Sequence, residues 1–351
     1  MGDRSTSRHS KPLHSTNQRT CPTIRHRNGP HHHVRGPGAG GANAVTAANV
    51  DYTPWLAAGT DMGDPGFQGD FSELWVDDDS PQTGTDGRIG EAVGLVSGST
   101  IHVVAGEYTE QIHITKNDVD IVGAGDDVVT IKSPASLTEY FTTGSNNNYP
   151  VIFVDGATGV GVSGVTVDGD GQGNANYRFV GVAYHNAGGT VQDCEIKDVR
   201  DEPISGAQHG VGIYALAETG ARALYVTGCD LNGYQKNGMV LIGEYLTAHV
   251  SDCDVVGYGP APLGLAAQNG IQLGDGATGT ITGNRVSGHA YVPHDWAAVG
   301  IMLPGAAGDI EVSDNELSEN SEGFYGINSS ATFTGNVVTA TQAGTGVTDC
   351  W

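Results

Sequence analysis

Val211-Gly212-Ile213-Tyr214-Ala215 and Asn269-Gly270-Ile271-Gln272-Leu273 are two copies of a short pattern that recurs between residues 179 and 328. The glycines of successive copies stand at positions 181, 212, 238, 270, 300 and 326, with intervals of 31, 26, 32, 30 and 26 residues. A fixed period of this size is typical of a stacked array in which each turn contacts only its neighbours. The pattern therefore predicts a coil of short strands.

A second pattern marks one turn of each coil. Three residues after an apolar position comes a cysteine or an asparagine, namely Cys194, Cys229, Cys253, Asn284, Asn315 and Asn336. Stacked amides form hydrogen-bond ladders, so we expect these asparagines, together with Asn237 and Asn269, to be structural. Equivalent residues of stacked strands lie about 4.8 Å apart. A Cys229–Cys253 disulfide is therefore conceivable, but packed thiols are favoured because free cysteine is usually buried. The remaining cysteines are Cys21 and Cys350, and no C-x-x-C spacing occurs.

Charge is distributed unevenly along the 351 residues. Residues 1–41 hold seven Lys/Arg and one acid, whereas the rest holds nine Lys/Arg and 39 Asp/Glu, a net charge of −30. An acidic body indicates a well-solvated surface or divalent-cation binding. It disfavours nucleic acid as a partner of the folded part. No apolar run approaches the roughly 18 residues of a membrane helix, so no membrane span is expected.

We expect three segments. Residues 1–50 are predicted to be a disordered basic N-terminal segment because they hold few apolar residues. Residues 51–71 are predicted to be a lead-in linker, and residues 72–351 a β-helix domain. Ile89, Val93 and Val96 fall on one face of a predicted helix at 88–96, which we expect to cap the first coil.

The first coils carry a family resemblance. Ile101 to Ile114, Val119 to Gly125 and Val129 to Ile131 resemble the opening coils of pectin-lyase-like right-handed parallel β-helices. The resemblance covers about residues 72–345 and implies the fold. It leaves the function open, because the superfamily includes lyases, hydrolases, esterases, epimerases and non-catalytic adhesins. The paired glutamines and catalytic aspartates of pectin methylesterases, and the calcium-binding aspartates of pectate lyases, have no clear counterpart here.

Alternation along the strands predicts a binding face. If Ile213, Met239, Ile271, Ile301 and Ile327 point inward, two outward columns flank the glycines. One column contains Lys236 and Gln268, and the other contains Tyr214 and Gln272. With glycine as a bare floor, the face would be a shallow trough suited to a sugar chain. The alternative is that glycine only permits a tight strand bend.

Acid–base chemistry would fall to three residues near this trough. Lys236 is one of nine Lys/Arg after residue 41, and apolar surroundings would favour its action as a general base. His209 with Glu202 or Asp201 would form an acid/base pair, and His185 lies one coil earlier. Tyr291 and Trp296, in a loop with His289, His294 and Asp295, could stack on a sugar. The common alternative is a solvated lysine and structural histidines.

Asp168, Asp170 and Asn174 resemble the start of a calcium loop and could hold Ca²⁺. The twelfth position is Phe179 where an EF-hand needs a bidentate Glu, which excludes a true EF-hand. His31, His32 and His33 could also bind a metal, although an accidental triplet is favoured.

The sequence thus predicts an all-β chain with a single right-handed parallel β-helix and a short N-terminal capping helix. The leading function is a secreted or surface-displayed module that binds a polysaccharide or cell-surface glycan along one strand face. It could also cleave the glycan as a polysaccharide lyase or glycoside hydrolase. The rival is a non-catalytic structural or adhesin segment of a larger surface protein. We expect a monomer located outside the cell or on its surface.

Overall fold

The computed structural model describes residues 51, 53–57, 70–81, 87–293, 295–305 and 307–339. All of them belong to one compact unit, residues 43–351. In this part of the chain, no helix has the length and the apolar character that crossing a membrane requires. Cys21, Cys350, the three successive histidines and His294 lie outside the described residues.

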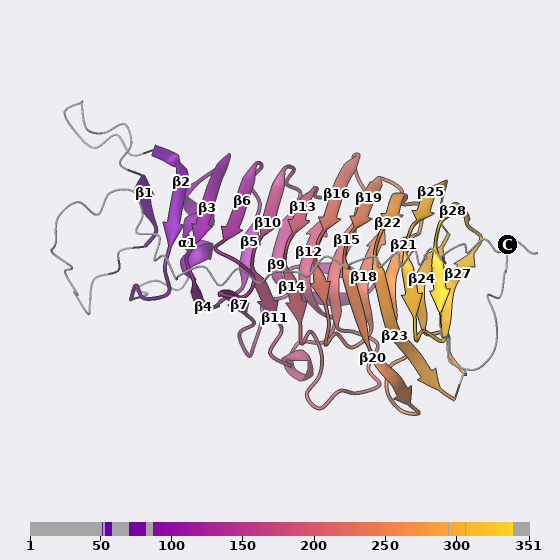
Figure 1. Cartoon of the computed structure of the whole chain (residues 1–351). Coiled ribbons are helices and arrows are strands. Elements are labelled where there is room, and N and C mark those ends of the chain that lie inside the picture. Colours follow the sequence, from indigo (N-terminus) through magenta and orange to yellow (C-terminus); the bar gives the residue numbers. More distant parts are fainter. Residues whose placement is uncertain are drawn as a thin grey trace, which may run out of the picture. The chain divides into compact units, whose positions relative to one another are not determined.

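Three sheets run along the length of the coil, and each turn of the chain adds a strand to each sheet in succession (Figure 1). Sheet A contains β1 (Trp55–Ala57), β2 (Asp70–Val76), β3 (Ser99–Val103), β6 (Val119–Gly123), β10 (Val160–Ser163), β13 (Gly189–Gln192), β16 (Arg222–Thr227), β19 (Leu246–Ser251), β22 (Thr278–Thr282), β25 (Ala307–Ser313) and β28 (Ser330–Thr334). Sheet B contains β4 (Gly106–Thr109), β7 (Val129–Lys132), β11 (Thr166–Asp168), β14 (Glu195–Lys197), β17 (Asp230–Leu231), β20 (Asp254–Pro262), β23 (Arg285–Val292), β26 (Glu316–Ser318) and β29 (Val337–Thr339).

Sheet C contains β5 (Ile112–Ile114), β9 (Asn146–Asp155), β12 (Phe179–His185), β15 (Val211–Leu216), β18 (Asn237–Ile242), β21 (Asn269–Gly274), β24 (Val299–Pro304) and β27 (Glu322–Ile327). Neighbouring strands within these three sheets are parallel except for β1, which pairs antiparallel with β2. The predicted parallel β-helix is therefore confirmed. Its core is one continuous column of buried Val, Ile and Leu side chains from all three sheets.

The helix α1 (Arg88–Leu95) covers the first coils, in agreement with the predicted cap. Ile89, Ala92 and Val93 are buried against the core. The buried Glu110, from the first coil, accepts hydrogen bonds from the N–H groups of Ile89 (3.1 Å) and Gly90 (2.8 Å). These N–H groups have no partner within the helix, so Glu110 replaces a conventional N-cap.

Two excursions leave the regular coil between sheets B and C. β8 (Phe141–Thr143) forms an antiparallel hairpin with the start of β9. β20 and β23 continue past the turn as a two-stranded ribbon, in which Gly259 to Pro262 pair with His289 to Val292. Figure 1 shows this ribbon reaching beyond the neighbouring strands of sheet B. A short 3₁₀ helix, η1 (Gly173–Ala175), lies between β11 and β12.

The turn between sheets A and B contains the predicted stack of Cys and Asn. Cys194, Cys229 and Cys253 are free buried thiols that donate to backbone carbonyls, as Cys229 does to Val191 at 3.5 Å. Asn284, Asn315 and Asn336 continue the stack as a hydrogen-bonded ladder. Packed thiols, not a disulfide, therefore occupy the cysteine part of the stack.

Candidate functional site

The glycines of sheet C face the interior of the coil and do not form the floor of an external trough. Gly212, Gly238 and Gly270 lie in register on β15, β18 and β21. A Cβ atom on Gly238 would lie 2.7 Å from Val255 Cγ1 and 2.8 Å from the carbonyl oxygen of Gly270. Only glycine fits this close approach between coil layers. The trough prediction is wrong in this respect, because close packing inside the coil requires these glycines.

The register of the last coil also differs from the prediction. Val299 pairs with Glu322 and Ile301 with Phe324, so Gly323, not Gly326, continues the glycine column. Phe324 packs against the core, whereas Ile327 is 43% exposed. The assignment of Ile327 to the inward column is therefore wrong.

The β8–β9 hairpin covers the outer face of sheet C over the early coils. The ring of Phe141 stacks on Phe153 (5.1 Å between centroids) and His185 (5.2 Å) and meets Tyr214 at 5.7 Å. Together with Val180 and other apolar side chains these rings form a second hydrophobic cluster outside the coil. Tyr214 is only 7% exposed, and burial raises its pKa to about 12. It packs within this cluster and does not line an open groove.

His185 lies between two carboxylates at the edge of the same cluster. Its Nδ1 is 3.5 Å from Asp155 Oδ1, and its Nε2 is 3.7 Å from Glu218 Oε2. His113 approaches the other oxygen of Asp155 at 3.9 Å, and its pKa is lowered by burial. His185 thus belongs to a surface charge cluster that is separate from His209.

Of the two acids predicted to pair with His209, the structure brings Asp201 to it and not Glu202. His209 is 4% exposed, and its Nε2 lies 3.1 Å from Asp201 Oδ1. Its Nδ1 accepts a hydrogen bond from the N–H of Phe179 at 3.5 Å, and burial lowers its pKa. Glu202 instead forms an ion pair with Arg200. Both nitrogens of His209 therefore serve internal contacts.

Lys236 is half-buried beside the start of β18. Its Nζ donates a hydrogen bond to the carbonyl oxygen of Ala267, and burial lowers its pKa to about 8. The neighbouring Gln268 is 2% exposed, and its amide donates to the carbonyl of Tyr234 at 2.6 Å. Gln272 is less buried and accepts a hydrogen bond from Asn237 Nδ2 at 3.2 Å. The amine of Lys236, with its lowered pKa, thus lies near the side-chain amide of Gln268. Both ends of that amide are hydrogen-bonded to backbone groups.

The two aromatic residues that were predicted to stack on a sugar differ in exposure. Tyr291, on β23 in the ribbon, is 3% exposed and packs with Ala261 and Ala298. Trp296 is 68% exposed. His289, placed by the sequence in a loop, is fully buried in the coil. Of these side chains, Trp296 is the one a ligand could reach.

The side chains predicted to bind calcium already have hydrogen-bond or ion-pair partners within the protein. Asp168 Oδ1 accepts the N–H of Asp170 at 2.7 Å, and Asp170 Oδ1 lies 3.3 Å from Lys132 Nζ. Asn174 Oδ1 accepts the N–H of Glu202 at 2.8 Å. Burial raises the pKa of Asp168, which weakens it as an anionic ligand.

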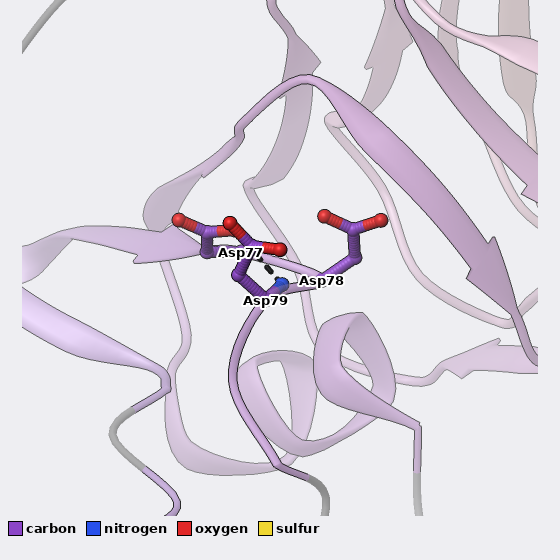
Figure 2. Close-up of side chains that lie close together, drawn as sticks. All are labelled: Asp77, Asp78 and Asp79. Carbon is purple, nitrogen blue, oxygen red and sulfur yellow. Dashed lines mark hydrogen bonds between the residues drawn. The ribbon is translucent and has the colours of Figure 1, made fainter. Parts of the chain in front are cut away.

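A different acidic group escaped the sequence analysis, although its three consecutive aspartates were a visible signal. Asp77, Asp78 and Asp79 follow β2 and offer carboxylate oxygens within 4.8 Å of one another (Figure 2). Asp77 Oδ1 accepts the N–H of Asp79 at 3.0 Å, and Asp78 Oδ2 accepts the N–H of Glu107 at 2.9 Å. The group stabilises a turn, and we assign no ion to it.

The outer face of sheet A contains a feature that the sequence analysis missed, a shallow depression of about 500 Å³ over β19, β22, β25 and β28. We call it the sheet A depression. It is lined by Thr247, His249, Thr278, Gly279, Thr280, Gly308, Asp309, Ile310, Glu311 and Thr332. Threonine at alternate positions of Thr278-Gly-Thr280-Ile-Thr282 was the signal available in the sequence.

Side-chain hydrogen bonds between coils order this depression. The hydroxyls of Thr247 and Thr278 are 3.2 Å apart, and His249 Nδ1 is 3.0 Å from the hydroxyl of Thr280. The ring of His249 stacks on Tyr225, which is 46% exposed, at 4.9 Å and 15°. An aromatic face, an imidazole and a row of hydroxyls therefore stand side by side on successive strands.

Comparison with known proteins finds related folds among solved structures. The chain is similar to pectin methylesterase from carrot, with 12% identity over 82% of this chain and 88% of that one and a TM-score of 0.49. It is similar to pectin methylesterase from Aspergillus niger, with 18% identity over 79% and 88% of the two chains and a TM-score of 0.45. It is also similar to ORF18 of Geobacillus virus E2, with 14% identity, 72% and 56% coverage and a TM-score of 0.33.

These likenesses concern the fold alone. Comparison with curated proteins returned no significant match. A family model described as right handed beta helix region matches residues 151–350, which is more than half of the chain, and the chain belongs to that family.

Proposed function

We propose that this protein is a polysaccharide-binding β-helix module and that the sheet A depression is its binding face. The observation that carries the proposal is the column Tyr225, His249, Thr280, Glu311 and Thr332. These five residues are in-register neighbours on five successive strands. Such a column presents an aromatic ring and hydrogen-bonding groups at steps of about 4.8 Å along the coil.

The chemistry of the column suits a sugar chain. Sugars expose hydroxyl groups around an apolar ring face, and the 46% exposed Tyr225 offers the part of its ring that His249 leaves uncovered, together with a polar tip. Threonine hydroxyls and carboxylates donate to or accept from sugar hydroxyls. Because bonds between coils already orient Thr247, Thr278 and Thr280, less side-chain entropy is lost when a ligand binds.

The proposal places the protein where polysaccharide occurs, outside the cell or on its surface, and we expect it to act as a monomer. An acidic body of net charge −30 supports a partner other than nucleic acid. Trp296 and Gln272, both accessible in sheet C and its loops, stay secondary candidates for glycan contact.

Titration of the full chain with a panel of oligosaccharides, followed by calorimetry, tests the proposal. Tyr225→Ala is expected to weaken binding about tenfold, as loss of an aromatic anchor does. Tyr258→Ala is the matched control, because Tyr258 is 59% exposed and lies on the ribbon, away from the depression. If no glycan binds, or if Tyr258→Ala weakens binding as much as Tyr225→Ala, the assignment to sheet A is overturned.

A second candidate, independent of the sheet A depression, is cleavage of a glycan at sheet C as a lyase or hydrolase, and the amine of Lys236 beside β18 favours it. A pKa of about 8 leaves part of this amine neutral near neutral pH, so it can accept a proton. In a lyase, Lys236 would take the proton beside a sugar carboxylate. A carbon–carbon double bond would then form as the glycosidic carbon–oxygen bond breaks, and the leaving oxygen would be protonated by water.

Unsaturated products absorb ultraviolet light, whereas hydrolysis releases reducing ends without that absorbance. We expect Lys236→Met to abolish lyase absorbance and to leave glycan binding at sheet A unchanged. Silence of both assays, together with binding, would support a non-catalytic adhesin. Silence together with no binding would support a structural segment.

A further inference from the structure

We propose that the glycan bound in the sheet A depression carries free amino groups, as in a deacetylated amino-sugar polymer. This inference rests on the proposed function and adds the charge of the ligand to it. It is carried by Asp309 and Glu311, the two carboxylates that line the depression on β25.

The charged residues that line the depression are all acidic. Both carboxylate residues are exposed, and none of the ten lining residues is Lys or Arg. Beyond residue 41 the chain carries 39 Asp/Glu against nine Lys/Arg, so the surrounding field has the same sign. Such a field draws cationic ligands toward the site and repels uronate chains.

The number of carboxylates favours cationic groups of a glycan over a metal ion. Asp309 and Glu311 are the two carboxylate residues that line the depression, whereas a calcium ion takes six to eight oxygen ligands. Ammonium groups of a bound glycan can each meet one carboxylate through a charge-assisted hydrogen bond.

Hydroxyls flank Glu311 on both sides and complete the recognition of a sugar. Thr280 and Thr332 are the in-register neighbours of Glu311 on β22 and β28. Tyr225 is three strands from Glu311 in the same column, about 14 Å away. A sugar ring in contact with the exposed part of Tyr225 and an amine at Glu311 can therefore belong to one short oligomer.

The test compares oligomers of equal length whose sugars carry a free amine, an N-acetyl group or a carboxylate: glucosamine oligomers, their N-acetylated forms and uronate oligomers. We expect the glucosamine oligomer to bind the full chain about three- to tenfold more tightly than the acetylated form at low salt, the range that two exposed ion pairs provide. High salt should remove the difference because exposed charges are screened. The double variant Asp309→Asn/Glu311→Gln should remove it too, while binding to the acetylated oligomer is kept.

The matched control is Asp230→Asn/Glu316→Gln, which changes the net charge equally at exposed sites on sheet B. If this control reduces the preference as much, the effect is general attraction and the inference fails. Equal binding of acetylated and free-amine oligomers to the unmodified chain also overturns the inference, and the proposed function survives. If no oligomer binds, the proposed function itself is overturned.

Discussion

Asn315 accepts two hydrogen bonds from Asn284, the residue that occupies the same turn one coil earlier. Its Oδ1 receives the backbone N–H of Asn284 at 3.0 Å and the side-chain amide at 2.9 Å. Asn315 in turn donates its own amide to the carbonyl of Ile281 at 2.8 Å and to Asn336. Each rung thus satisfies buried groups of the rung before it, which makes the turn between sheets A and B a chain of mutually dependent contacts.

Asn315→Ala is expected to destabilise the protein by about 2–3 kcal/mol, because it leaves a buried N–H and a buried carbonyl without partners. Asn336→Ala, in the half-buried terminal rung, should cost less. Denaturant unfolding followed by circular dichroism measures both. Equal losses at the two positions would contradict a cooperative ladder, because water can replace the lost hydrogen bonds at the half-buried terminal rung but not at the buried Asn315.

Gly238→Ala tests the inward orientation of the glycine column. The new Cβ would press on Val255 and on the carbonyl of Gly270, and overpacking of this kind costs about 1–3 kcal/mol. Gly94→Ala is the matched control, because a Cβ on Gly94 meets no atom within 4 Å and this residue lies inside α1. Helix propensity predicts that the control is stabilised by roughly 0.5–1 kcal/mol. A neutral Gly238→Ala would restore the bare-floor interpretation.

The repeat spacing was sufficient to predict the strands and, in every regular coil but the last, the register of sheet C, because a solenoid places residues one period apart in contact. The cap was predicted separately, from the apolar face of residues 88–96. Period-2 alternation was insufficient to predict the faces. Gly212 and Ile213 both face inward, since a Cβ on Gly212 would lie 3.0 Å from Leu231 while Ile213 is fully buried. Two consecutive inward residues break the alternation on which the two outward columns were predicted. The column with Lys236 and Gln268 therefore does not line an open groove.

Excursions from the coil were the other source of error. Most of the segment 136–149 is polar, yet its Phe141 stacks on Phe153 and meets the ring of Tyr214 at a tilt. In the last coil Gly323 and Gly326 are both available, and the pattern Tyr325-Gly326-Ile327 imitates the repeat. The period could not decide between them because hydrogen-bonded register, not spacing, selects Gly323. The sheet A depression was visible as alternating threonines, but its shape arises only when several strands are stacked.

His289 should make stability depend on pH. Its Nδ1 is 2.8 Å from Asn320 Oδ1 and its Nε2 is 2.5 Å from the Tyr234 hydroxyl, all inside the coil. Burial lowers its pKa from 6.5 to about 4. Because the unfolded chain binds a proton at pH 6.5 while the folded one does not until pH 4, stability is complete above 6.5 and falls as the pH drops toward 4. The loss should approach about 3 kcal/mol.

Unfolding free energies measured between pH 7.5 and pH 4 test this loss of stability. Other titrating groups also contribute to the change with pH, so the comparison needs a variant without His289. His289→Gln keeps a hydrogen-bonding side chain that does not titrate in this range, so its curve should be flatter than that of the unmodified chain by that amount. Parallel curves for the two proteins would show that His289 does not control the acid sensitivity.

Lys236 should react as a neutral amine at unusually low pH. Its ammonium form is disfavoured by burial, which lowers the pKa from 10.5 to about 8. The rate of modification by a small amine-specific reagent, followed by peptide mass spectrometry, should therefore reach half its maximum near pH 8. The same lysine in the denatured chain is the control, because there it should titrate near 10.4. If lyase activity is found, its rate should rise through the same pH range as the amine loses its proton. An activity that falls as the pH rises through 8 would exclude Lys236 as its general base.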